Sequence, residues 1–104
     1  MTYYDKLVRD KIPQILKEKE KEFVAYKAAD CDYFPYLKRK LIEEVDEFLK
    51  LPSLKELADV QEVVNALLKE MDYVQADLRR ERAIKIDERG AFEEHWILAE
   101  VKDG

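Results

Sequence analysis

The chain has 104 residues, with 24 acidic and 19 basic side chains and a formal net charge of −5. Its hydrophobic residues come in short clusters, none near the run of about 20 that a membrane span needs. One cysteine and one histidine exclude an internal disulfide and a Cys/His zinc site. The acidic excess disfavours nucleic-acid binding, which draws its affinity from Lys and Arg at phosphates. We therefore expect one soluble, cytoplasmic domain over residues 1–104, without a membrane or stable nucleic-acid partner.

Few glycines and prolines occur, two and three in all, so the composition favours helices over turns and barrels. The first helix is expected to begin at Asp10, a favourable cap, with Pro13 in its first turn. The second is expected over about 33–50, where apolar residues recur at helical spacing. Short extended segments are expected near 23–28 and 92–101.

Two further helices follow from capping patterns. Ser53 with Glu56 three residues later forms a capping box for the third helix. Asp72 and Gln75 repeat that pattern for the fourth, which Gly90 is expected to end. The sequence therefore predicts an all-α, four-helix bundle-like domain.

Two acids fall on or beside the apolar face of the second helix. At about 100° per residue, Leu37, Leu41 and Val45 mark an apolar stripe. Glu44 lies within this stripe, and Glu47 lies one turn further on at its border. Glu43 and Asp46 lie on the opposite side of this helix, which is expected to face water.

The third helix repeats the arrangement, with Glu56 inside its apolar face and Asp59 at the edge. Four carboxylates converging from two antiparallel helices would repel one another, and each buried one is costly. A hard divalent cation reverses that balance, and oxygen ligands suit Mg²⁺, or alternatively Mn²⁺. The competing interpretation is that these acids only form ion pairs with neighbouring bases.

Basic side chains gather in two places and could bind phosphates. They precede the first helix or share one face of the fourth: Lys6, Arg9, Lys11, Arg82, Lys85 and Arg89. Asn65, on the core side of the third helix, is a further candidate for binding a substrate. The alternative for the basic residues is a solvated face with surface ion pairs.

Four blocks of the chain together resemble a known family. They are KLVRDKIP at 6–13, KLIEEVDEF at 40–48, ELADV at 56–60, and Lys85 followed by RGAF at 89–92. In order and spacing they are similar to small MazG-like, phosphoribosyl-ATP pyrophosphohydrolase-like all-α enzymes. Ala91 departs from the second glycine of that family's Arg-Gly-Gly-Phe ending.

The resemblance implies hydrolysis of nucleoside triphosphates between the α and β phosphates, with either ordinary nucleotides or modified ones, removed as house-cleaning, as substrates. It implies that Glu44, Glu47, Glu56 and Asp59 bind Mg²⁺ and, together with Lys85, are the catalytic residues. It also implies a homodimer or homotetramer. Two alternatives stay open: a non-catalytic helical dimerisation or interaction module, and a sensor that binds a nucleotide without cleaving it.

Overall fold

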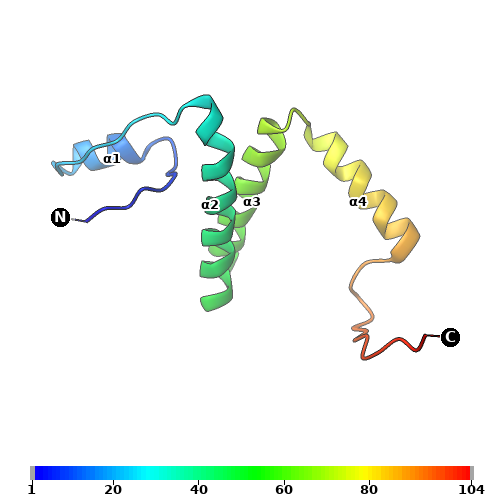
Figure 1. The fold of residues 1–104 in the computed structure, drawn as a ribbon. Coiled ribbons are helices and arrows are strands. Elements are labelled where there is room, and N and C mark those ends of the chain that lie inside the picture. The colour runs from blue at the N-terminus through cyan, green and yellow to red at the C-terminus, as the bar shows by residue number, and fades with distance from the viewer. Residues whose placement is uncertain (1, 104) are drawn as a thin grey trace. The chain divides into compact units, whose positions relative to one another are not determined.

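The computed structural model describes residues 2–103, and these are all-α, with four helices and no strand. The helices in chain order are α1 (Ile12–Glu18), α2 (Asp30–Lys50), α3 (Leu54–Glu70) and α4 (Gln75–Arg89), as Figure 1 shows. The predicted fold class and number of helices are confirmed. Residues 23–28 and 92–101, expected to be extended, lie outside the helices and form no strand.

Two compact units make up the chain. The first ends at Asp72 and contains α1, α2 and α3, and the second begins at Tyr73 and contains α4 and the tail that follows it. None of the residues of α4 is buried. No helix in residues 2–103 has the length and apolar character needed to cross a bilayer.

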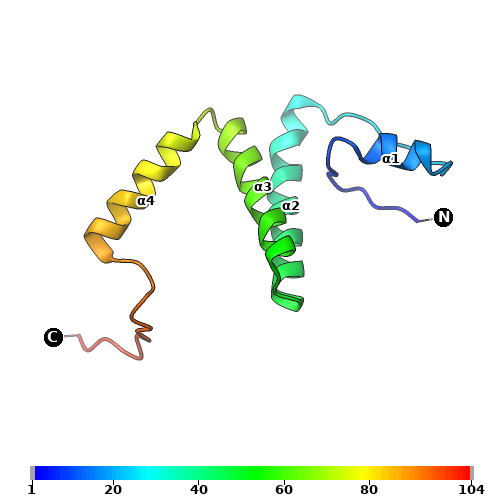
Figure 2. The same cartoon turned by 180° about the vertical axis from the view of Figure 1, so that it is seen from behind.

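Helices α2 and α3 form an antiparallel hairpin and lie side by side in both views (Figure 1; Figure 2). Their contact supplies the buried core of the described residues, which consists of Leu37, 1 % exposed, and Val63, 8 % exposed. The third buried residue is the acid Glu44, 7 % exposed. A carboxylate therefore lies among the best-shielded side chains of the hairpin.

The start of α3 was predicted correctly from the sequence, and the start of α2 was not. The predicted cap of α3 is confirmed, because the Glu56 backbone N–H donates to Ser53 Oγ at 3.1 Å. Helix α2 begins three residues earlier than predicted, at Asp30, and Pro35 lies inside it. Acidic residues in the first turn favour this earlier start through the helix dipole. Pro35 gives up only one backbone hydrogen bond near the helix start, so the helix continues through it.

Two predicted caps are wrong. The residue before α1 is Lys11, without a side-chain cap, so Asp10 does not cap this helix. At α4 the box is formed by Asp77, whose Oδ2 accepts from the Val74 N–H at 2.9 Å, and not by Asp72 with Gln75. An acid in the first turn can accept from the N–H of the residue before the helix, so no capping side chain is needed in front of it. The predicted end of α4 at Gly90 is confirmed, with the φ of +82° that favours glycine.

Candidate metal centre

Three of the four predicted acids converge across the hairpin. Glu44 of α2 and Glu56 and Asp59 of α3 each place a carboxylate oxygen within 4.8 Å of the others. We call these three residues the acidic triad. Glu56 and Asp59 share a face because they lie three residues apart on one helix. Mg²⁺ binds oxygens at about 2.0–2.1 Å, so two of its ligand oxygens lie at most about 4.2 Å apart, and the triad would share one ion after closing by a few tenths of an ångström.

Two oxygens of the triad are shielded from solvent and have no hydrogen-bond partner, namely Oε2 of Glu44 and Oε2 of Glu56. The other oxygen of Glu44 lies 3.2 Å from Lys40 Nζ. Burying an unpaired carboxylate oxygen is costly unless something else satisfies it. Oxygen ligands with free lone pairs, drawn from three acids, fit a hard divalent cation, so this triad could hold Mg²⁺ or Mn²⁺.

Like charges around Glu56 change its titration. Removal from water raises the pKa of Glu56 above its usual value, and the charges of Glu47, Asp59 and Glu44 raise it further. Removal from water and the neighbouring negative charges both disfavour the charged form of Glu56. A bound cation would reverse this effect, because it favours the charged form of each carboxylate.

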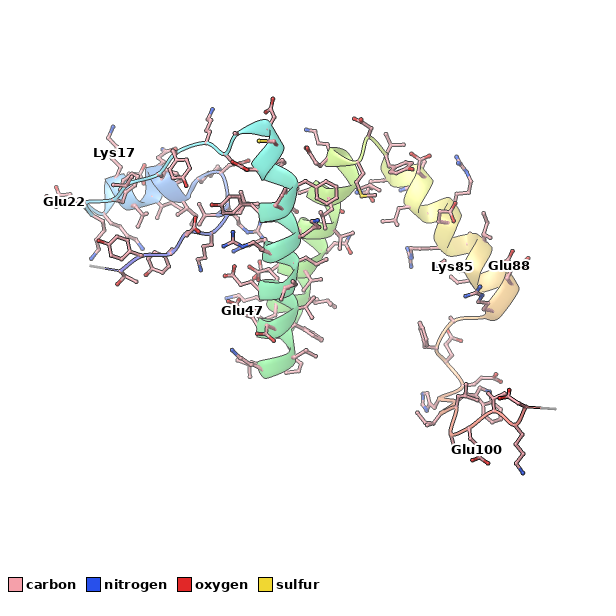
Figure 3. All side chains as sticks on the ribbon, viewed as in Figure 1. Lys17, Glu22, Glu47, Lys85, Glu88 and Glu100 are labelled. Carbon is pink, nitrogen blue, oxygen red and sulfur yellow. The ribbon has the colours of Figure 1, made fainter. Side chains whose placement is uncertain are left out.

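Glu47, the fourth predicted ligand, is not a member of the triad. It is exposed on α2 near the end that leads into the turn (Figure 3). Its negative charge still raises the pKa of Glu56. Glu47 therefore lies at the rim of the triad, next to the solvent.

A basic segment at the start of the chain lies against the same hairpin. Arg9 donates to Asp59 Oδ1 at 2.7 Å, and Lys6 donates to Glu43 Oε1 at 3.0 Å. The hydrogen bond to Glu43 raises the pKa of Lys6. Both residues were predicted to bind phosphates. In the structure they form ion pairs with acids of the hairpin.

Asp5 holds this segment along α2. Tyr36 donates to Asp5 Oδ1 at 2.6 Å, and Arg39 donates to the Asp5 carbonyl at 3.0 Å. The hydrogen bond to Asp5 and a second one involving Tyr26 raise the pKa of Tyr36 to about 12. A cavity of about 220 Å³ lies beside these contacts. Its lining combines aromatic and charged side chains: Tyr4, Asp5, Lys6, Leu7, Tyr36, Arg39, Lys40 and Glu43.

Sequence reasoning missed two residues next to the triad. Lys40 contacts both Glu44 and Glu43, and its position four residues before Glu44 on one helix was the signal that could have found it. Glu43 was predicted to face water, but the segment carrying Lys6 covers it. Burial alone would raise the pKa of Glu43, yet the hydrogen bond from Lys6 and the charge of Lys40 outweigh burial and lower it.

The other predicted binding residues lie apart from these contacts or in the second unit. Lys11 is exposed just before α1, and Asn65 Oδ1 accepts from Gln61 Nε2 at 3.0 Å on α3. Three basic residues are exposed on α4, of which Figure 3 labels Lys85: Arg82, Lys85 and Arg89. Their role at a phosphate, and that of Lys85 in catalysis, stay predictions.

Comparisons of this chain with protein-family models, curated proteins and solved structures find no match. The resemblance carried by the four sequence blocks therefore stays a prediction. What the structure adds is independent of it: three acids, brought together across a helical hairpin, with two shielded oxygens that lack partners.

Proposed function

We propose that this chain is a Mg²⁺-dependent nucleoside triphosphate pyrophosphohydrolase, which cleaves between the α and β phosphates to give a nucleoside monophosphate and pyrophosphate. The observation that carries the proposal is the acidic triad with its two shielded, unpartnered oxygens. Cations of this kind are commonly held by a few carboxylates and shared with substrate phosphates. The resemblance of the four sequence blocks to the MazG-like family supports the reaction class.

Glu44, Glu56 and Asp59 would hold the ion, with Glu47 at the rim of this group. When bound, the ion supplies Lewis-acid polarisation of the phosphate oxygens and neutralises their charge. Glu47 is exposed and outside the triad, so it is the carboxylate free to accept a proton from the attacking water. The water oxygen bonds to the α-phosphorus while the bond to the bridging oxygen breaks, and pyrophosphate leaves with that oxygen.

The nearby cations would bind the phosphates. Lys6 and Lys40 line the cavity beside α2, together with the rings of Tyr4 and Tyr36. Cations bind phosphate oxygens, and aromatic rings offer a surface on which a base can stack. The family resemblance gives Lys85 the role of offsetting charge that develops on the leaving pyrophosphate. Modified nucleotides are the proposed house-cleaning substrates.

Assembly into a homodimer or homotetramer is part of the proposal. The hairpin leaves large apolar side chains exposed around its turn, with Leu49 67 %, Leu51 72 % and Leu54 83 % exposed. A small domain with so little buried core gains stability by covering such a surface. The same surface favours the second candidate function, a non-catalytic helical interaction module.

A panel of standard and modified nucleoside triphosphates, incubated with Mg²⁺, tests the proposal by the release of monophosphate and pyrophosphate. We expect release in equal amounts, and its loss with a chelator. Glu47→Gln should abolish release while Asp46→Asn should not, because Asp46 is an exposed acid of the same helix outside the triad. Nucleotide binding without turnover would favour a sensor, and neither binding nor turnover would favour the interaction module.

A further inference from the structure

Two side-chain cations contact the acidic triad. Lys40 Nζ lies 3.2 Å from Glu44 Oε1, and Arg9 donates to Asp59 Oδ1 at 2.7 Å. Together they bring a charge of +2 to a group of three carboxylates, the same charge as one divalent cation. These two side chains therefore already supply a counter-charge as large as that of the ion.

The two cations differ in how firmly they are held. The Lys40 side chain is 15 % exposed, projects from α2 and also contacts Glu43, so it belongs to the packed hairpin. The Arg9 side chain is 58 % exposed and comes from the segment before α1, outside any helix. The acids they contact differ in the same direction: the side chain of Asp59 is 37 % exposed, and that of Glu44 is 9 % exposed. Arg9 is thus the cation that can leave.

We propose that Arg9 is an exchangeable internal counter-ion of the metal centre. Its guanidinium holds Asp59 in the metal-free protein and gives up this carboxylate when a divalent cation binds the triad. This inference rests on the proposed function for the identity of the two ligands, a divalent cation and a nucleotide. The released guanidinium is then free to bind a phosphate oxygen of the nucleotide, for which its paired donors are suited.

Competition of this kind couples the two ligands. A metal that takes Asp59 frees Arg9 for the phosphates, and a phosphate that takes Arg9 removes the competitor from Asp59. Each ligand then raises the affinity for the other by the same factor, because linkage is reciprocal. Exchange also keeps Asp59 paired when no metal is bound, although the shielded oxygens of Glu44 and Glu56 stay without partners.

The test is the affinity of the purified full chain for Mn²⁺ alone, measured by isothermal titration calorimetry at fixed salt without nucleotide. Arg9→Gln should bind Mn²⁺ about 2- to 5-fold tighter, since exposed ion pairs contribute only this much to a competing equilibrium. Lys17→Gln is the matched control: it removes one positive charge from exposed helix α1 without touching the triad, and its affinity should be unchanged. Arg9→Lys keeps the charge and should fall between the wild type and Arg9→Gln.

A second measurement separates competition from simple loss of structure. The KM for a nucleoside triphosphate should rise in Arg9→Gln while its Mn²⁺ affinity also rises, and a damaged fold would weaken both. Equal or weaker Mn²⁺ binding by Arg9→Gln overturns the exchange and leaves the metal centre standing. If neither the wild type nor the variants bind Mn²⁺, both the exchange and the proposed metal centre are wrong.

Discussion

Glu44→Gln is the sharpest single perturbation of the proposed metal centre. Glu44 is the only member of the acidic triad that comes from α2, so it links a bound ion to the packing of the hairpin. Gln has nearly the same shape and keeps an oxygen that can accept from Lys40. It removes one charge from the triad and places an amide at one of the carboxylate oxygens.

The expected loss of Mg²⁺-dependent stability follows from the loss of metal affinity. Loss of a partner one shell away from a metal costs 10- to 100-fold in affinity, so loss of a charged direct ligand should cost about 100-fold or more. At a Mg²⁺ concentration of about 100 times the wild-type Kd, the wild type gains about 2.7 kcal/mol and the variant about 0.4 kcal/mol. For a domain of this size these gains raise Tm by about 10–20 °C and about 2–3 °C respectively.

The assay is thermal unfolding followed by circular dichroism. Tm is measured in Mg²⁺ and compared with Tm in buffer that contains a chelator and no divalent cation. Asp46→Asn, the exposed neighbour on α2, is the control and should gain as much as the wild type. An equal Mg²⁺-dependent rise in Tm for Glu44→Gln would show that the ion does not bind at this carboxylate. No rise in the wild type would refute the metal centre itself.

Three further changes test the packing and the charge balance. The folded-state pKa of Glu56 lies above its ordinary value of 4.5, so its favourable contribution is complete below that value and lost as pH rises through the raised pKa. In chelator, Glu56→Gln should therefore raise Tm at pH 7, and the gain should fade towards pH 4; a constant gain would contradict this. Leu37→Ala should cost about 2–5 kcal/mol in urea unfolding, because it empties the best-buried site of the hairpin. Ser53→Ala should cost about 1 kcal/mol by removing the cap of α3, and no loss would mean that the cap contributes nothing.

The helical periodicity of the sequence was enough to predict on which face of its helix Glu44 or Asp59 lies. One rotation of about 100° per residue placed Glu44 inside the apolar stripe of its helix, and the structure buries it to 7 % exposure. The same reasoning placed Asp59 at an edge, where it is half-buried. These predictions worked because a helix fixes its own faces locally, whatever it packs against.

Contacts between distant segments were not predictable in this way. Arg9 and Asp59 are separated by 50 positions, and nothing in their local sequence indicates that they meet. The partial burial of Glu43 depends in the same way on a segment 37 positions earlier, which carries Lys6. Two caps failed for a different reason: a helix can begin without a capping side chain in front of it, and an acid inside its first turn then accepts from the N–H of the preceding residue, as Asp77 does at α4.

The position of Glu44 is itself an argument for a ligand. Only three of the described residues are buried, and one of them is this acid, beside Leu37 and Val63. An interaction module that needed only a stable hairpin would gain by an apolar side chain there, because a shielded carboxylate oxygen without a partner costs stability. Local choices that oppose the fold are expected at functional sites, where the cost is offset by what the site binds. The hairpin gives one of its few buried positions to a negative charge, and a cation shared with Glu56 and Asp59 is what would make that placement favourable.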